Sequence, residues 1–318
     1  MKGSLILDET YLVAIKKVNF EGGREEIDSV IRRLLLERDL LQKLAGCKTV
    51  VRFMDFIQNK NEIYMVTKFC DQGNMKQYLQ MSKGFRNMKQ IMYYFAQIAQ
   101  TIYFLHTNNM ILAGLKPDSV LFHKKTIKLN EIYSCALSNE ELFLKMKENP
   151  NFFAPELVFE QKYGKEVDVW SLGLLLYYMI YEKMPWGKEK NVKELRSYLA
   201  ECDPNGKFAS FPEEWRFNVN PLIKEFINKM VCIQPRNRIS LLNILQDPLL
   251  SLFFEPKKES SQFYTKNKTD TLLDTSSDKM NAKMTFSIWK EEKEEVNVNK
   301  IREMKFNFLS RSTNTNKK

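Results

Sequence analysis

Few residues in this sequence are cysteines or histidines, the types that form structural zinc sites or disulfides, and they are scattered. The cysteines are Cys47, Cys70, Cys135, Cys202 and Cys232, and the histidines are His106 and His123. Zinc sites usually need cysteine pairs a few residues apart, and no two cysteines here are separated by only two residues. We therefore expect neither a structural zinc site nor a disulfide framework.

One lysine and one glutamate are better candidates for chemistry. Lys16 ends the run Val13-Ala14-Ile15-Lys16, and Glu37 follows 21 residues later in a leucine-rich stretch. Taken singly, each has a plain explanation, because lysines often follow strands and most helix glutamates are solvated. Their chemistry therefore depends on whether the fold brings them together.

The length and composition limit the class of protein. A chain of 318 residues can hold one large domain or two lobes with their own cores. Apolar residues make up 44% and charged residues 28%, which is ordinary for a globular protein. No apolar run approaches the roughly eighteen residues of a membrane helix, and residues 1–10 lack the features of a signal peptide. We expect no membrane span and a cytoplasmic or nuclear protein.

The net charge of +10 raises the question of nucleic-acid binding. From Lys257 onward, 14 basic and 9 acidic residues give +5, which leaves +5 for the first 256 positions. The charges there are mixed in sign, and no basic stripe is interleaved with aromatic residues. We therefore do not expect a nucleic acid as partner.

The first 70 residues have the pattern of a small sheet with one helix. Residues 5–7 and 11–18 are rich in β-branched and aromatic residues and predict a hairpin. Leucines and isoleucines at helical spacing predict a helix over about 26–45. Two further strands are predicted at 50–57 and 62–69, so the lobe has the order strand, strand, helix, strand, strand.

Helical periodicity prevails beyond Gly73. Helices are predicted at 75–80, 88–107, 168–181, 192–201, 221–231 and 240–246, short strands at 120–122 and 127–129, and a loop at 137–152. Residues 255–318 are rich in Lys, Ser, Thr, Asn and Asp, which is typical of a disordered tail. Within it, residues 284–308 carry enough aromatic and aliphatic side chains to fold against a partner or the domain.

Several short sequence motifs resemble those of the protein kinase superfamily in their order and spacing. Val13-Ala14-Ile15-Lys16 is similar to the strand that places a phosphate-binding lysine, and Glu37 stands where a helix carboxylate pairs with that lysine. Tyr64-Met65-Val66-Thr67-Lys68-Phe69-Cys70 resembles the strand and hinge that hold adenine, with Thr67 in the gatekeeper place. The remaining matches are Phe153-Ala154-Pro155-Glu156, Asp168-Val169-Trp170-Ser171-Leu172-Gly173 and Pro235-Arg236-Asn237-Arg238-Ile239-Ser240.

This resemblance implies an α+β, bilobal protein kinase-like fold. Residues 1–70 would form a small β-rich N-lobe without its first strand, 71–254 a larger, mainly helical C-lobe, and 255–318 the basic tail. It also implies a buried ion pair between Glu156 and Arg238, and an anchor at Asp168 for the backbone of the catalytic loop. The residues implied to contact a nucleotide are Ala14, Lys16, Glu37, Thr67, Lys68, Phe69, Cys70 and Leu121.

The catalytic loop departs from the family pattern. Active members have His-Arg-Asp-Leu-Lys-Pro-x-Asn, where this chain has Leu112-Ala113-Gly114-Leu115-Lys116-Pro117-Asp118-Ser119. Gly114 thus replaces the aspartate that accepts the substrate proton, and Ser119 replaces an asparagine that binds a second magnesium ion, while Lys116 is retained. The Asp-Phe-Gly motif has become Glu131-Ile132-Tyr133, which leaves Glu131 as a weak candidate for a metal ligand.

Two further departures weaken the case for catalysis. Glu148-Asn149-Pro150 stands where Gly-Thr-Pro is usual, so the threonine that contacts the catalytic residues is missing. Only Gly3 lies before Val13, so the first strand and the glycine-rich loop that covers the phosphates have no counterpart. A truncated sequence and an abbreviated lobe would both explain this absence.

These departures predict a pseudokinase, a catalytically impaired kinase domain that acts as a scaffold or allosteric binding partner. The expected partner is a protein, for example an active kinase, and the oligomeric state is left open. The alternative is an ATP-binding serine/threonine kinase with weak or atypical activity, because Lys116-Pro117 resembles the catalytic loop of that class. The expected cofactor is ATP, with or without Mg²⁺, bound weakly or not at all.

Overall fold

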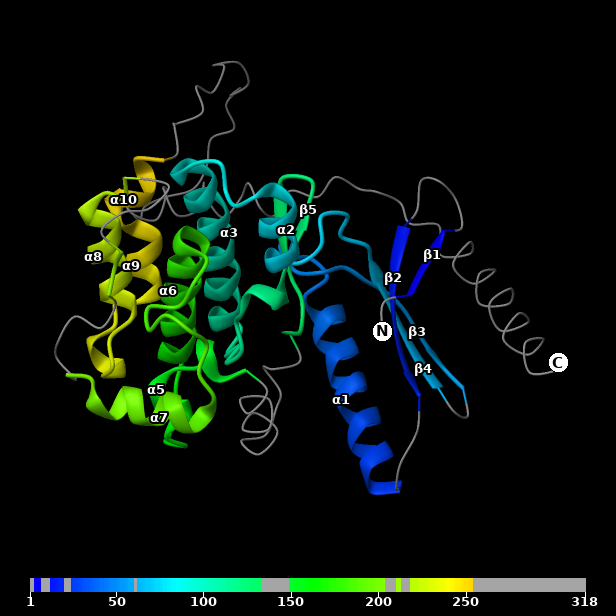
Figure 1. The fold of residues 1–318 in the computed structure, drawn as a ribbon. Helices are drawn as coiled ribbons and strands as arrows, with labels where there is room; N and C mark the ends of the chain where they lie inside the picture. The colour runs from blue at the N-terminus through cyan, green and yellow to red at the C-terminus, as the bar shows by residue number, and fades with distance from the viewer. Residues whose placement is uncertain are drawn as a thin grey trace, which may run out of the picture. The chain divides into compact units, whose positions relative to one another are not determined.

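The computed structural model describes residues 3–6, 12–19, 24–59, 62–132, 149–203, 210–212 and 218–253. These residues form two compact units (Figure 1). The sheet unit contains the described residues of 1–78 and 117–141, and the helical unit contains those of 79–116 and 142–290. The predicted α+β class, with a small antiparallel sheet and a larger helical part, is confirmed.

Strand β4, Glu62–Lys68, forms the centre of the sheet unit. The sheet has the order β1-β2-β4-β3, with every neighbouring pair antiparallel. Residues 63–66 of β4 are buried, as expected for an inner strand that pairs on both sides. The other strands are β1 (Gly3–Ile6), β2 (Leu12–Asn19) and β3 (Phe53–Gln58).

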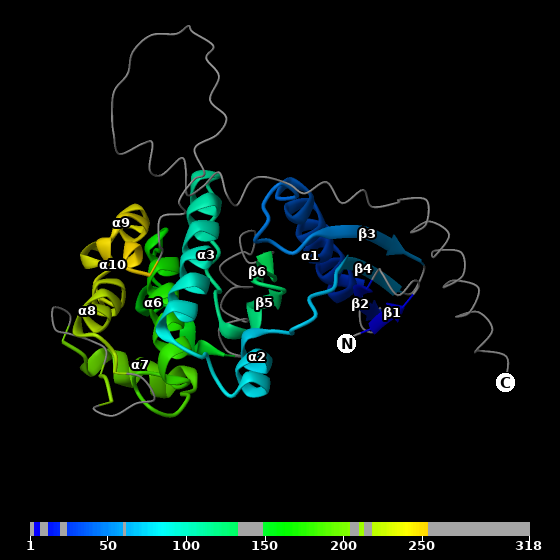
Figure 2. The same cartoon turned by 90° about the horizontal axis from the view of Figure 1, so that it is seen from above.

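Helix α1, Arg24–Lys43, packs beside β3 and supplies the apolar cover of the sheet (Figure 2). Leu34, Leu41 and Leu44 are buried at helical spacing, so one stripe of the helix faces inward. The same stripe carries Glu37, which is also buried. A carboxylate is therefore placed within the apolar face that joins helix and sheet.

A second hairpin completes the sheet unit. Strand β5, Val120–His123, pairs with β6, Thr126–Leu129, after the 3₁₀ turn η1, Pro117–Ser119. The amide of Leu129 donates to the carbonyl of Thr49 at 2.7 Å, and the amide of Val51 donates to the carbonyl of Leu129 at 2.9 Å. The hairpin is thereby tied to residues 49–51, far away in the sequence.

Helix α6, Glu166–Tyr181, forms the core of the helical unit. It is buried on nearly all sides and packs against α3 and α8, which suits a helix that is apolar all round. The surrounding helices are α3 (Met88–Thr107), α5 (Pro155–Val158), α7 (Val192–Glu201), α8 (Pro221–Met230), α9 (Leu241–Gln246) and α10 (Pro248–Ser251). Helix α2, Met75–Ser82, begins in the sheet unit and ends in the helical unit.

The predicted elements and the observed ones agree best where a long apolar stripe exists. Helices α3 and α7 have the predicted bounds, whereas α1 begins and ends two residues earlier than predicted. The 3₁₀ turns and the four-residue helices α5 and α10 were not predicted, because they are too short to show a period. Most of the predicted loop at 137–152 and the whole tail lie outside the described residues.

No helix in the described part of the chain has both the length and the apolar content needed to cross a bilayer.

Gly173 allows α6 to approach the end of α8. A β-carbon added at this position would lie 2.6 Å from Val231 Cγ2 and 2.7 Å from Met230 Cβ. Both distances are shorter than van der Waals contact, and Met230 Cβ is fixed to the backbone. The lack of a side chain is therefore a packing requirement at this position.

We predict that Gly173→Ala destabilises the protein. Overpacking typically costs about 1 to 3 kcal/mol, which exceeds the roughly 1 kcal/mol that alanine gains in a helix. The matched control is Gly46→Ala, because an added β-carbon there meets no atom within 4 Å. Thermal unfolding should show a lower Tm for Gly173→Ala alone, and equal Tm values for the two variants would contradict the packing argument.

Candidate functional site

Lys16 and Glu37 form an ion pair in the sheet unit. Lys16 lies on β2 and Glu37 on α1, and Lys16 Nζ donates to Glu37 Oε2 at 2.8 Å. The glutamate side chain is 4% exposed and the lysine side chain 46% exposed. The buried carboxylate thus fixes the direction of an ammonium that solvent or a ligand still reaches.

The predicted hinge residues follow directly from the pairing of β2 with β4. Ala14 lies opposite Thr67, and Val13 lies opposite Lys68. The amide of Phe69 then donates to the carbonyl of Leu12 at 3.3 Å, which continues the pairing past the end of β4. Leu121 lies on β5 and forms an isolated bridge with Asn74.

Cys70 ends the hinge as a buried thiol. It is 6% exposed, and burial raises its pKa to about 11. A thiol with this pKa stays protonated and weakly nucleophilic near neutral pH. Cys70 therefore acts as a small apolar residue in this place.

Ser119 and Glu131 lie just outside the same end of the β5–β6 hairpin. Val120 pairs with Leu129, and the amide of Asn130 donates to the carbonyl of Ser119 at 2.9 Å, so Glu131 follows immediately. Ser119 is buried, and Glu131 has a φ of +58°. A side chain is thus held in the left-handed region, which costs roughly 1 to 3 kcal/mol outside glycine.

The side chains at this hairpin end do not form a metal site of their own. Asp118 is already engaged, because its Oδ2 lies 3.0 Å from Lys76 Nζ. Within the described residues, no group of three or more His, Cys, Asp or Glu side chains could hold a metal ion. Magnesium at Glu131 would thus need nucleotide oxygens to complete its octahedral coordination.

Asp168 in the helical unit fixes the backbone at residues 112–113, in the segment that the resemblance predicts to be the catalytic loop. Asp168 is fully buried, and its carboxylate accepts from the amides of Leu112 at 2.9 Å and Ala113 at 2.7 Å. His106 Nε2 lies 2.8 Å from the same carboxylate, and it donates because an ionised carboxylate only accepts. Three donors from residues 106–113 therefore converge on one carboxylate that is more than fifty residues away in the sequence.

This anchor supports a strained residue. Ala113 has a φ of +47°, which costs an alanine about 1 to 2 kcal/mol. Hydrogen bonds to charged groups contribute roughly 1.5 to 3 kcal/mol each, so the two amide bonds offset the strain. Gly114 follows directly, and Lys116 is half-buried two residues later. The loop is thus held in a specific conformation, although position 114 carries no functional group.

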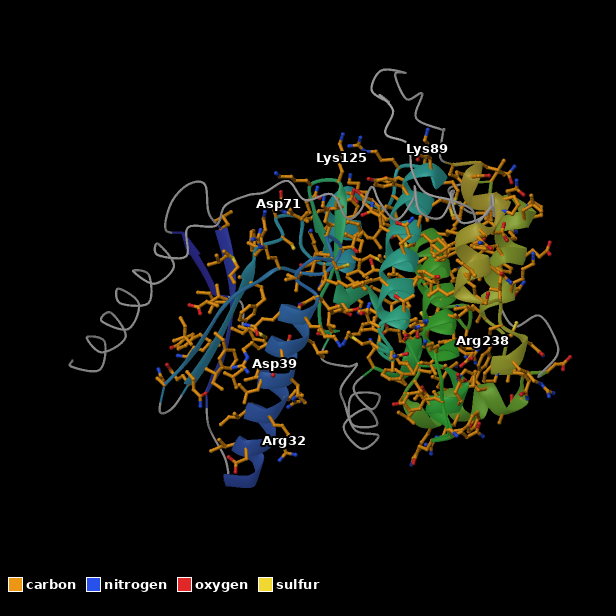
Figure 3. All side chains as sticks on the ribbon, turned by 180° about the vertical axis from the view of Figure 1, so that it is seen from behind. Arg32, Asp39, Asp71, Lys89, Lys125 and Arg238 are labelled. Atoms are coloured by element: carbon orange, nitrogen blue, oxygen red, sulfur yellow. The ribbon has the colours of Figure 1, made fainter. Side chains whose placement is uncertain are left out.

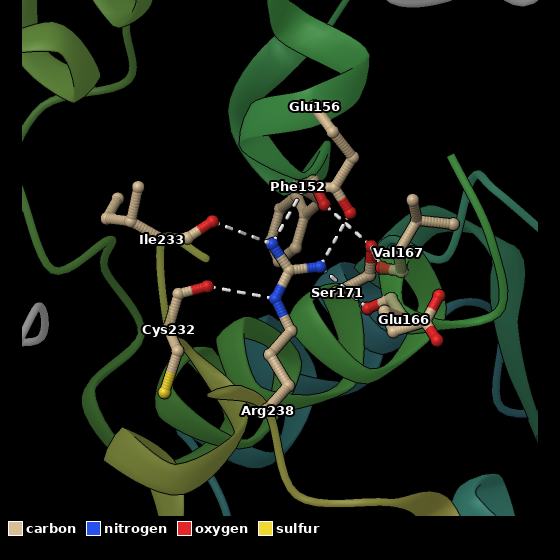
Figure 4. Close-up of polar contacts among 8 residues, drawn as sticks. All are labelled: Phe152, Glu156, Glu166, Val167, Ser171, Cys232, Ile233 and Arg238. Atoms are coloured by element: carbon tan, nitrogen blue, oxygen red, sulfur yellow. Dashed lines mark hydrogen bonds and ion pairs between the residues drawn. The ribbon is translucent and has the colours of Figure 1, made fainter. Parts of the chain in front are cut away.

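Glu156 and Arg238 form a buried, bidentate ion pair (Figure 4). Arg238 Nη1 and Nη2 donate to Glu156 Oε1 and Oε2, both at 2.7 Å. The other three N–H groups of the guanidinium donate to the carbonyls of Glu166, Cys232 and Ile233. All five donors of the arginine are therefore satisfied, as a buried guanidinium requires.

Arg238 connects segments that are far apart in the sequence. Its guanidinium also lies over the ring of Trp170, with 5.1 Å between Cζ and the ring centroid. Figure 3 shows Arg238 inside the helical unit, among the side chains of its helices. Arg238 thus ties α5 to the start of α6 and to the residues that follow α8.

Two residues that position this region were not predicted from the sequence. Asn151 is buried, and its Oδ1 accepts from Trp186 Nε1 at 3.1 Å and from the amide of Lys190 at 2.8 Å. His106 was considered only as a metal ligand, whereas it contacts Asp168. The sequence signals were weak, since each is a single polar residue in an apolar surrounding. Tyr133 and Glu148 lie outside the described residues.

Known proteins similar to this chain are protein kinases. A family model described as "Protein kinase domain" matches residues 5–250. The probable serine/threonine-protein kinase HSL1 of Saccharomyces cerevisiae is 29% identical over 223 residues, which are 69% of this chain and 14% of that protein. The liver/testis phosphorylase b kinase gamma catalytic chain of Mus musculus is 26% identical over 263 residues, 80% of this chain and 62% of that protein.

A third relative is the serine/threonine-protein kinase STE20 of Saccharomyces cerevisiae. It is 27% identical over 246 residues, which are 75% of this chain and 24% of that protein. The chain therefore spans less than two thirds of the length of these relatives.

We predict that Arg238→Ala strongly destabilises the helical unit. Removing one partner of a buried ion pair costs about 3 to 5 kcal/mol, because Glu156 keeps a buried charge. The control is Lys229→Ala, which removes an exposed pair with Glu225 and should change stability by under about 0.5 kcal/mol. Urea unfolding measures both, and an unchanged midpoint for Arg238→Ala would show that the pair is dispensable.

Proposed function

The chain belongs to the protein kinase superfamily, and we propose that it is a pseudokinase that binds a protein partner as a scaffold or allosteric regulator. Its expected partner is a component of phosphorylation signalling, such as an active kinase. The expected location is the cytoplasm or the nucleus. Efficient phosphate transfer is not part of the proposed function.

The observation that carries this proposal is Gly114. In the family, the carboxylate at this position accepts the proton of the attacking hydroxyl, and glycine has no side chain to accept it. General-base help of this kind contributes about 10² to 10⁴ in rate, or roughly 3 to 5 kcal/mol. The neighbouring backbone is still anchored by Asp168, so the framework of the loop is kept without its reactive group.

Other replacements also lower the rate of phosphate transfer that we expect from this chain. Ser119 offers a short hydroxyl where the family has an asparagine amide, and Glu131 is one methylene longer than the usual aspartate. Asn149 caps the turn before the activation-segment end, where the family has a threonine. In contrast, the contacts of Glu156, Asp168 and Arg238 keep the fold intact, which suits a module selected for its surface.

The test is a phosphate-transfer assay with the purified chain. It would be incubated with γ-labelled ATP, Mg²⁺ and a generic basic substrate, alongside a Lys16→Met variant. We expect the same background incorporation for both, because the base at position 114 is missing. Turnover typical of the family that is lost in Lys16→Met would overturn the proposal.

A second candidate function is a weak or atypical serine/threonine kinase that binds ATP. The ion pair between Lys16 and Glu37 favours it, because in the family this pair directs the lysine towards the α and β phosphates. The competing explanation is that the pair only fixes α1 against the sheet. The candidate contacts for the nucleotide are those of the hinge, Thr67 to Cys70, with Ala14 and Leu121.

Thermal unfolding with ATP separates these two explanations. A ligand stabilises by an amount set by its concentration over its Kd, about 2.7 kcal/mol at one hundred times Kd. If Lys16 holds phosphate, millimolar ATP should raise the Tm of the wild type but not of Lys16→Met. If the pair is structural, ATP should leave both Tm values unchanged, and Lys16→Met should lower Tm with or without ATP.

A further inference from the structure

The outer face of α1 carries a row of exposed side chains. Arg32, Leu36, Asp39 and Lys43 are all exposed, and their spacing of four, three and four residues places them on one stripe of the helix. The buried stripe that faces the sheet lies on the opposite side, and Leu36 is 38% exposed. Figure 3 shows Arg32 and Asp39 on this helix. We call these four residues and the adjacent Arg33 the outer α1 surface.

The positive charges on this surface outnumber the available negative ones. Asp39 is already engaged, because Arg38 Nε donates to Asp39 Oδ1 at 2.7 Å. Within the described part of the chain, the side chains of Arg32 and Arg33 form no ion pair or hydrogen bond, not even with Asp28 one turn away. Both arginines are exposed. Two guanidinium groups on one helix are therefore available to an anionic segment.

The most acidic run of the chain lies beyond the described residues. Residues 291–295 read Glu-Glu-Lys-Glu-Glu, and no other window of five residues contains four acidic ones. Phe286, Ile288 and Trp289 come just before this run. An apolar group beside several carboxylates is complementary to an exposed leucine beside two arginines. We call residues 286–295 the acidic segment.

The sequence between the described residues and the acidic segment is long. Residues 254–285 separate Phe253, the last described residue, from the acidic segment. An unstructured chain of 32 residues has a root-mean-square span of about 30 Å, which is the size of a small domain. The acidic segment can therefore reach surfaces far from Phe253, and its tether keeps its local concentration at about the millimolar level.

We propose that the acidic segment docks on the outer α1 surface of the same chain. Its glutamates pair with Arg32 and Arg33, and the side chain of Trp289 covers Leu36. Each exposed ion pair stabilises the contact only weakly, but the tether makes weak contacts sufficient. The segment approaches α1 from the side opposite Glu37, so the ion pair of that buried carboxylate stays intact.

This inference goes beyond the proposed function, because it needs neither a partner nor a nucleotide. It assigns a role to a segment whose apolar side chains the proposed function leaves unused. A failure of its test would leave the phosphate-transfer experiment valid.

The test is zero-length carbodiimide cross-linking of the full chain, which joins a carboxylate to an amine only when the two are in contact. Arg32→Lys/Arg33→Lys keeps both charges and the helix propensity of α1, and it supplies amines on the outer α1 surface. The matched control is Arg236→Lys, because Arg236 is also exposed and has no ion-pair partner among the described residues. Mass spectrometry should find about tenfold more cross-links per amine from residues 291–295 to the α1 amines than to the control amine.

A tail variant and isotope labelling complete the test. Trp289→Ala keeps every carboxylate and should lower the yield of cross-links, because it removes the apolar contact with Leu36. Equal yields at positions 32–33 and 236, or a yield that Trp289→Ala leaves unchanged, would overturn the proposal. Cross-links that mainly join isotopically labelled to unlabelled chains would assign the surface to a second copy and would overturn docking within one chain.

Discussion

The structure depends on one buried charge, the carboxylate of Asp168. It accepts from two consecutive amides, those of Leu112 and Ala113, and from the ring of His106, and it is completely shielded from water. A carboxylate in this position is stable only while its donors are present, and the strained backbone of Ala113 is stable only while the carboxylate is present. Anchor and loop therefore stabilise each other, and this mutual dependence needs no functional group at position 114. The loop can lose its reactive side chain without losing its conformation.

In the rest of the chain, too, the residues that stabilise the fold differ from those expected to act on a ligand. Glu156 accepts two of the five N–H groups of Arg238 and backbone carbonyls accept the other three, and Lys16 and Glu37 join α1 to the sheet. The Glu156–Arg238 pair acts through burial and geometry, so its loss would affect folding first. Gly114, Ser119 and Glu131 stand at positions where the family resemblance implies side chains that act on a ligand. A chain with this division keeps contacts that stabilise its fold while it lacks side chains that the family uses on a ligand.

The fold could be predicted from the sequence where an apolar stripe is long or where several motifs occur in a fixed order. The apolar stripe of α3 gave its exact bounds, and the spacing of the motifs pointed to the protein kinase family. Several contacts between polar residues could not be predicted from local sequence patterns, because the two partners lie in segments more than fifty residues apart. His106 and Asp168 are separated by 62 residues, and Lys48 and Lys128 by 80. The role of Asn151 was missed for a different reason, because a single amide residue shows no periodicity that a sequence pattern could reveal.

Amide hydrogen exchange at Leu112 and Ala113 tests most directly whether the loop keeps a fixed conformation without a carboxylate at position 114. If Asp168 anchors the loop, both amides should exchange nearly as slowly as the slowest amides of α3, and Asp168→Asn should accelerate them while most of α3 stays protected. Fast exchange at both positions in the wild type, at the rate of an exposed loop, would contradict the account. In that case the loss of the carboxylate at position 114 would have been accompanied by loss of the framework itself.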